Sequence, residues 1–93
     1  MIGLTRAIAV DHAAAGIGAV AICPGTVESE RITKFLANHP DPTAARRAMS
    51  ERQLDGRMGT PDEVATGIAF IASRDGRLIN GSEFVRDGGM TAR

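Results

Sequence analysis

Three side chains of this 93-residue sequence have the types found in hydrolytic triads: Ser29, His39 and Asp41. A serine nucleophile on an α/β scaffold usually lies in a Gly-x-Ser-x-Gly turn, which exposes its hydroxyl group. Ser29 lies in the stretch Val-Glu-Ser-Glu, which is not such a turn, so we discard the triad. The other histidine, His12, is far from His39 in the sequence, and neither has Cys or carboxylate companions at ligand spacing. We therefore expect no metal site.

The Pro24-Gly25 pair after an apolar run is better placed to meet a ligand. Residues 19–23 read AVAIC, and an unbroken apolar run of this length is typical of a strand that is buried on both faces of a parallel sheet. Proline ends such a strand because it has no N–H, and glycine permits a sharp turn. Open α/β sheets bind ligands beyond the carboxyl ends of their strands. In most proteins, taken alone, such a pair only terminates the strand.

Five segments are expected to build the fold around this turn. We predict a helix end over residues 1–15, a strand over 19–23, a polar lid-like segment over 26–55, a helix over 61–73 and a last strand over 82–86. The fold class is therefore α/β, with two parallel strands joined by a right-handed crossover and with three to four helices. The first helix lacks an N-cap residue, whereas Gly16 suits its C-terminus.

Capping residues mark two helix starts. The Asp41-Pro42 pair predicts a short helix that runs to about Gln53 inside the lid-like segment. The Thr60-Pro61-Asp62-Glu63 stretch is a capping box, for which we expect no chemical role. Asp87-Gly88-Gly89 is interpreted as a plain turn after the last strand. A basic cluster balanced by nearby carboxylates is interpreted as a solvated helix face: Arg46, Arg47, Arg52 and Arg57.

Four pieces of the sequence, in this order, resemble the short-chain dehydrogenase/reductase family: IGLTRAIAVDHAAAGI, AVAICPGTVES, RMGTPDEVATGIAFIAS and INGSEFVRDGG. The first is similar to the second half of the helix that begins with the family's catalytic Tyr-x-x-x-Lys pair. The second is similar to the sixth strand and its Pro-Gly turn, and the others to the last helix and the last strand. The resemblance covers nearly the whole chain. It implies the C-terminal part of a doubly wound, Rossmann-like parallel sheet, and hydride transfer between a nicotinamide cofactor and an alcohol or ketone.

The resemblance also implies roles for single residues. Four positions match the family's cofactor-binding turn: Pro24, Gly25, Val27 and Ser29. The backbone of Val27 is expected to meet the nicotinamide carboxamide. Ser29 stands where the family usually has Thr, and its hydroxyl is expected to reach the carboxamide or the phosphates. The stretch 32–53 resembles the family's substrate lid. Its apolar residues form either a lid surface or an ordinary packing stripe: Ile32, Phe35 and Leu36.

Several departures from the family pattern bear on activity. Gly18, Ala19 and Val20 occupy places where family members commonly have Arg-Val-Asn. The family's Gly-rich phosphate turn, catalytic Ser and Tyr/Lys pair all precede the region that this chain resembles, and the chain contains no Tyr. Proton transfer in this family needs a Tyr phenol whose pKa is lowered by the Lys. We therefore expect no catalytic residue and no turnover in this chain alone. NAD or NADP is expected in the intact fold, and no cofactor on the chain alone.

Composition argues against other classes of function. Eleven basic and eleven acidic residues cancel, and the aromatic residues are three Phe, so the chain lacks the positive charge and the stacking surfaces that nucleic-acid binding uses. No apolar run approaches the roughly 20 residues of a membrane span. The first residues do not have the pattern of a signal peptide. Cys23 is the single cysteine, and a reducing, cytoplasmic location is expected.

Three interpretations of the chain stay open. The first is a truncated gene, or one with a mispredicted start, of a family oxidoreductase; the DNA upstream of Met1 tests it. The second is a non-enzymatic interaction module that forms a homo-oligomer or pairs with subunits of this family. The third is a complementing fragment whose other half is a separate chain. For the 93-residue chain itself we expect a loosely folded, oligomerising or aggregation-prone state, because a two-stranded parallel sheet needs both of its faces covered.

Overall fold

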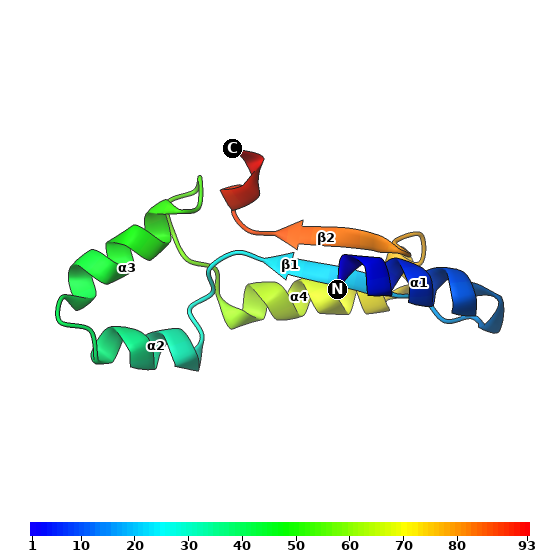
Figure 1. Ribbon diagram of the computed structural model, residues 1–93, viewed down its shortest axis with the longest axis horizontal. Helices are drawn as coiled ribbons and strands as arrows, with labels where there is room; N and C mark the ends of the chain where they lie inside the picture. Colours follow the sequence, from blue (N-terminus) through cyan, green and yellow to red (C-terminus); the bar gives the residue numbers. More distant parts are fainter. The chain divides into compact units, whose positions relative to one another are not determined.

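The computed structural model describes residues 1–93 and divides the chain into two compact units. The sheet unit comprises residues 1–23 and 66–85, and the loop unit comprises residues 24–65 and 86–93. Four α-helices, two strands and three short 3₁₀ turns make up the secondary structure (Figure 1). This α/β composition, with two strands side by side, confirms the predicted fold class.

Helix α1 (Ile2–His12) opens the sheet unit and tightens into a 3₁₀ turn over Ala13–Ala15. Its first turn has no side-chain cap, as predicted. The chain leaves the 3₁₀ turn through Gly16, whose φ of 78° is the left-handed conformation that favours glycine. The structure therefore has helical segments over the predicted residues 1–15, followed by the predicted glycine exit.

Strands β1 (Val20–Pro24) and β2 (Ser82–Arg86) are hydrogen-bonded neighbours, and their arrows point the same way in Figure 1. The β2 bounds are those predicted, and β1 is shifted by one residue. Ahead of the strands the pairing continues, because the Gly81 N–H donates to the Ala19 carbonyl over 2.8 Å. The Asn80 side-chain oxygen accepts the Ala19 N–H over 2.9 Å. The entry to β1 is thus fixed by both backbone and side-chain bonds.

Helix α4 (Pro61–Ala72) begins in the loop unit, and its residues from Thr66 onward belong to the sheet unit. It contacts β2 through Phe70 and Phe84, whose rings lie 6.1 Å apart at 28°. The helix is followed by a 3₁₀ turn at Arg74–Gly76. A Cβ at Gly76 would lie 2.4 Å from the Ile71 carbonyl oxygen, so only glycine lets the chain turn back this closely over the end of the helix.

Burial in the sheet unit is slight, and here one expectation is wrong. We expected both faces of the first strand to be covered, yet only Ala21 of β1 is buried, while Val20, Ile22 and Cys23 are partly exposed. An open groove of about 710 Å³ runs beside the strand, lined by residues of β1, of α4 and of the turns that flank them, both apolar and polar. Two strands and the helices of this unit supply too few side chains to cover an apolar strand on every side.

The loop unit carries two helices, α2 (Glu30–Ala37) and α3 (Pro42–Glu51), which contact each other. The Asp41 carboxylate caps α3 by accepting the Ala44 N–H over 3.2 Å, and Pro42 is the first helical residue. The predicted Asp41-Pro42 start is therefore confirmed. The helix ends at Glu51, two residues earlier than expected, and Gln53 takes a different role described below.

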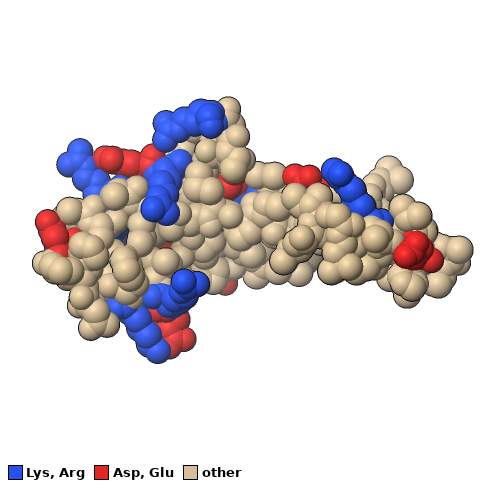
Figure 2. Space-filling model, viewed as in Figure 1, with Lys and Arg blue, Asp and Glu red and all other residues tan.

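Charged residues are concentrated in the loop unit. Figure 2 shows Lys, Arg, Asp and Glu side chains of both signs interspersed over α2 and α3, and fewer over the sheet unit. The sheet unit contains six charged residues: Arg6, Asp11, Arg74, Asp75, Arg77 and Glu83. None of the helices combines the length and apolarity needed to span a bilayer.

Candidate functional site

The chain leaves β1 through residues 25–29, here called the exit loop. Its first residue, Gly25, donates its N–H to the Arg86 carbonyl over 3.3 Å, which extends the strand pairing by one step. A Cβ at Gly25 would lie 2.7 Å from the Gln53 side-chain oxygen and 2.9 Å from the Asp87 backbone. Backbone cannot move aside as a flexible side chain can. The glycine of the predicted Pro24-Gly25 turn is therefore required by close packing.

A short parallel bridge between Val27 and Gly59 holds the middle of the exit loop. The Glu28 N–H donates to the Gly59 carbonyl over 2.8 Å, and the Gly59 N–H donates to the Thr26 carbonyl over 2.9 Å. The Val27 carbonyl accepts the Ser29 N–H over 2.7 Å, whereas the Val27 N–H donates to no group within the chain. The loop thus presents one ordered backbone donor that its own structure does not use.

Ser29 ends the exit loop and caps helix α2. Its hydroxyl oxygen accepts the Ile32 N–H over 3.4 Å, and its carbonyl accepts the Thr33 N–H over 2.9 Å. The hydroxyl proton is not used in any hydrogen bond within the chain. Because a serine hydroxyl donates and accepts at once, the Ser29 hydroxyl has an unused donor while it caps the helix.

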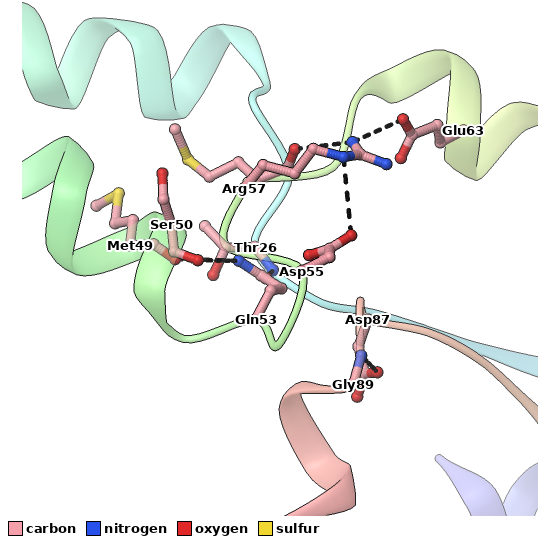
Figure 3. A network of polar contacts seen from close by, with 10 residues as sticks. Thr26, Met49, Ser50, Gln53, Asp55, Arg57, Glu63, Asp87 and Gly89 are labelled. Atoms are coloured by element: carbon pink, nitrogen blue, oxygen red, sulfur yellow. Dashed lines mark hydrogen bonds and ion pairs between the residues drawn. The ribbon is translucent and has the colours of Figure 1, made fainter.

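Gln53 is a functional candidate that sequence reasoning missed. It is 4% exposed, and its side-chain oxygen accepts the Thr26 N–H over 2.7 Å. Its amide nitrogen donates to the Met49 carbonyl over 3.0 Å, as Figure 3 shows. Nothing in the sequence distinguishes it from a solvated glutamine at the end of an amphipathic helix, because its partner Thr26 lies far away along the chain.

An ionic cluster lies between the end of the lid-like segment and α4. The Arg57 guanidinium donates to Glu63 over 2.8 Å and lies 3.7 Å from the Asp55 carboxylate (Figure 3). The hydrogen bond from Arg57 lowers the pKa of the Glu63 carboxyl, and a backbone bond from Thr60 lowers it further. The Glu63 N–H in turn donates to the Thr60 hydroxyl over 3.2 Å. This reciprocal pair is the capping box predicted from the sequence.

Asp87 has a larger structural role than the plain turn that we expected. Its carboxylate is nearly buried and accepts three hydrogen bonds, from the Gly89 N–H, the Thr91 N–H and the Thr91 hydroxyl. The hydroxyl bond from Thr91 and these backbone bonds lower the pKa of the Asp87 carboxyl below its ordinary value. Gly88 and Gly89 have φ of 59° and 84°. The Asp87 carboxylate therefore holds the start of the 3₁₀ turn at Met90–Ala92 by accepting these hydrogen bonds.

Acidification is expected to break the hydrogen bonds between the Asp87 carboxylate and residues Gly89 and Thr91. Because the folded-state pKa of Asp87 is lowered, its stabilising contribution is complete above the ordinary aspartate pKa of about 3.9 and is lost as the pH falls through the lower folded value. The NMR signals of the Gly89 and Thr91 amides should therefore shift together as the pH falls below the ordinary aspartate pKa of about 3.9. Asp87→Asn should abolish this titration, whereas Asp62→Asn, at an exposed aspartate, should leave it intact. A Thr91 amide that does not respond to acid in the wild-type chain would contradict the expectation.

A cavity of about 150 Å³ lies among the exit loop, Gln53 and the ionic cluster. Its polar lining includes groups of both charges: Thr26, Gln53, Arg57, Glu63, Arg86 and Asp87. Pockets for small organic ligands usually measure about 300–1,000 Å³. This cavity by itself is too small for a dinucleotide.

The three apolar lid candidates lie on α2 and differ in burial. Leu36 is 6% exposed and Phe35 is 50% exposed, and Ile32 is intermediate. The Phe35 ring lies 5.6 Å from the His39 ring, and His39 Nδ1 accepts the Asp41 N–H over 3.0 Å. Leu36 thus packs within the loop unit, whereas half of the Phe35 surface is exposed to solvent.

Comparison with known proteins identifies the family and the fold of this chain. A family model described as Enoyl-(Acyl carrier protein) reductase matches residues 1–91. "Dehydrogenase/reductase SDR family member 6" of Xenopus laevis is 38% identical over 91 residues, which are 98% of this chain and 37% of the relative. The chain therefore spans little more than a third of that relative's length.

Two solved structures show the same fold. A short chain dehydrogenase family protein from Francisella tularensis superposes with a TM-score of 0.88 at 27% identity, over 99% of this chain and 40% of that one. A 4-hydroxyisoleucine dehydrogenase complexed with NADH superposes with a TM-score of 0.86 at 30% identity, over 99% of this chain and 36% of that one. The chain belongs to the short-chain dehydrogenase/reductase family.

Proposed function

We propose that this chain is the cofactor- and substrate-facing C-terminal part of an NAD(P)-dependent oxidoreductase and has no activity by itself. The observation that carries the proposal is the Val27 N–H, which is held in an ordered bridge to Gly59 and donates to no group of the chain. An ordered, unused backbone donor beyond the carboxyl end of a parallel strand is suited to a polar ligand group. A nicotinamide carboxamide oxygen is such a group.

Each residue of the cofactor set has a role in this proposal. Pro24 ends β1, and Gly25 brings the exit loop close to the Asp87 backbone. The Val27 N–H donates to the carboxamide, and the free proton of the Ser29 hydroxyl donates to the carboxamide or to a phosphate oxygen. When bound, the nicotinamide supplies the hydride. The chain's own contribution is to orient the ring through these donors.

The inactivity of the chain alone follows from missing chemical groups. Reduction of a carbonyl group needs a proton donor beside the hydride, and general acid catalysis of this kind contributes about 10²–10⁴-fold to the rate. The chain has no Tyr. Nor does it contain a Gly-rich turn between a strand and a helix, the arrangement that holds a pyrophosphate. The exit loop supplies one side of a site whose other side another polypeptide segment must provide.

The helices α2 and α3 act as the substrate lid in this proposal. Ile32 and Phe35 supply apolar surface to the substrate, and Leu36 anchors α2 within the loop unit. Phe35 is the residue best suited to a substrate contact, because its ring is fixed against His39 while half of its surface stays exposed.

A second candidate function is that of a complementing or interaction chain, which pairs with a subunit of this family. The specific observation in its favour is exposed surface of the sheet unit: the open groove of about 710 Å³ beside β1, and the exposed apolar side chains Leu4, Val10, Ile68 and Phe70. Apolar side chains of this size stabilise an association when a partner chain buries them.

Both candidate functions can be tested by mixing the chain with the part of a relative that precedes the matched region. The partner is the part of the Xenopus laevis relative that precedes the matched region, produced separately. NADH and NADPH binding is followed by nicotinamide fluorescence, with each part alone as control. We expect tight binding only in the mixture. Binding by the chain alone would contradict the proposal, and so would an associated mixture that binds neither nucleotide.

Two variants of Val27 sharpen the experiment. Val27→Pro removes the proposed amide donor but none of the bonds that hold the exit loop, since the Val27 N–H takes part in none of them. Val27→Ala keeps the donor and trims the side chain. In the mixture, Val27→Pro should weaken nucleotide binding by up to about tenfold, whereas Val27→Ala should change it little. Equal effects of the two variants would exclude the Val27 N–H as the donor.

A further inference from the structure

Gln53 makes hydrogen bonds from both ends of its side-chain amide. The oxygen accepts the Thr26 N–H over 2.7 Å, and the nitrogen donates to the Met49 carbonyl over 3.0 Å. The nitrogen also lies 3.5 Å from the Ser50 carbonyl oxygen. Met49 and Ser50 lie in the last turn of α3, which ends at Glu51. The buried Gln53 side chain therefore joins the last turn of α3 to Thr26 of the exit loop, the residue before Val27.

The backbone around Gln53 is shaped to admit this side chain. A Cβ at Gly25 would lie 2.7 Å from the Gln53 oxygen, and one at Gly88 would lie 2.9 Å from Gln53 Cγ. The next residue, Leu54, donates its N–H to the Gly88 carbonyl over 2.8 Å. The segments that leave β1 and β2 therefore both close on Gln53 and its neighbour, with glycine at the two points of contact.

Few residue types satisfy this position. The Thr26 N–H needs an acceptor, and the two carbonyls of α3 need a donor, so the side chain must offer both at the end of two methylene groups. Leucine has a similar volume but would leave the partly buried Thr26 N–H without a partner. Ionised glutamate would keep the acceptor but would place a negative charge against the Met49 and Ser50 carbonyl oxygens. A protonated glutamic acid, by contrast, offers the same acceptor and donor as glutamine.

We infer that Gln53 is a positioning residue, which sets the backbone of Thr26 and Val27 according to the position of helix α3. The inference rests on the proposed function, because it adds a link between the substrate lid and the nicotinamide donor of the same site. A displacement of α3 carries the Gln53 amide with it and pulls on the Thr26 N–H. The Val27 N–H is therefore aimed at the carboxamide only when the end of the lid helix is in place.

Amide hydrogen exchange in the full 93-residue chain tests the link without any cofactor. The Thr26 amide should be protected in the wild type, and Gln53→Leu should lower its protection about tenfold, as expected for the loss of one buried hydrogen bond. The Glu28 amide, which donates to Gly59, reports the folding of the exit loop and should change little. An unprotected Thr26 amide in the wild type would overturn the inference. So would an equal loss at Thr26 and Glu28 in the variant.

The Gln53→Glu variant gives a readout that a general loss of folding would not produce. Burial raises the pKa of a carboxyl group, so this glutamate should be neutral in mildly acidic solution and ionised in basic solution. Thr26 protection, corrected for the intrinsic exchange rate, should match the wild type at low pH and fall as the carboxyl ionises. Protection that is the same at all pH values, either at the wild-type level or at that of Gln53→Leu, would contradict the positioning role.

Nucleotide binding in the mixture described above tests the positioning role of Gln53 separately from the proposed cofactor-binding function. If the wild-type mixture binds NADH or NADPH, Gln53→Leu should raise the dissociation constant at least about fivefold, and Gln53→Glu should do so only when it is ionised. Unchanged affinity in Gln53→Leu would overturn the link between lid and cofactor while leaving the proposed function in place. A wild-type mixture that binds no nucleotide, with Thr26 still protected through Gln53, would instead refute the proposed function.

Discussion

Titrated with NADH or NADPH, the 93-residue chain alone is expected to show a dissociation constant weaker than about 1 mM, equivalent to about 4 kcal/mol of binding free energy. The exit loop supplies one backbone donor, from Val27, and one hydroxyl donor, from Ser29. Each is worth about 0.5–1.5 kcal/mol in net terms. Such a total does not offset the loss of translational and rotational freedom on binding, which costs at least about 4 kcal/mol.

The same preparation is expected to oxidise no NADH or NADPH with any small ketone. The measurement is the loss of absorbance of the reduced nicotinamide, in chain purified free of host enzymes. The 4-hydroxyisoleucine dehydrogenase whose structure is complexed with NADH, titrated with NADH in parallel, shows that the titration can detect a complete site. A saturable titration of the chain alone in the micromolar range would mean that the exit loop suffices for binding, and turnover that follows the chain through purification would refute its inactivity.

Self-association is the second large effect that we expect, since the apolar surface of the sheet unit has no cover within the chain. Leu4 and Val10 on α1 are 65% and 78% exposed, and no large side chain anywhere in the protein is completely buried. Burial of one such side chain in an interface stabilises association by about 1.5–3 kcal/mol. Multi-angle light scattering after gel filtration should therefore give a mass above the 9.7 kDa of one chain.

Replacing both residues by lysine should move the chain toward the monomer. The pair Leu4→Lys and Val10→Lys removes two apolar contacts and should raise the dissociation constant of the oligomer about 100-fold or more. The added charge alone improves solubility, so the matched control is Thr43→Lys with Ala48→Lys, two exposed positions on α3. A monomeric wild type that melts cooperatively when dilute, or equal shifts in the two double variants, would show that α1 is not an association surface.

Local sequence determined most of the secondary structure, because caps and breakers act within a few residues. The Asp41 cap, the Thr60–Glu63 capping box and the left-handed Gly16 occur where the pattern placed them. Each depends on hydrogen bonds or dihedral preferences that reach no farther than one helical turn. For the same reason the α/β class and the bounds of β2 could be predicted without knowledge of any long-range contact.

Contacts between distant residues decided the rest. The apolar pattern of β1 predicted burial of both faces. Burial, however, depends on how many other segments cover a strand, and the sequence of the strand does not determine that number. Gln53 joins Thr26 across 27 positions, and the clash that makes Gly25 necessary involves Asp87. The sequence alone showed which residues form the exit loop. Only the tertiary structure showed what holds that loop, because its supports come from three separate parts of the chain.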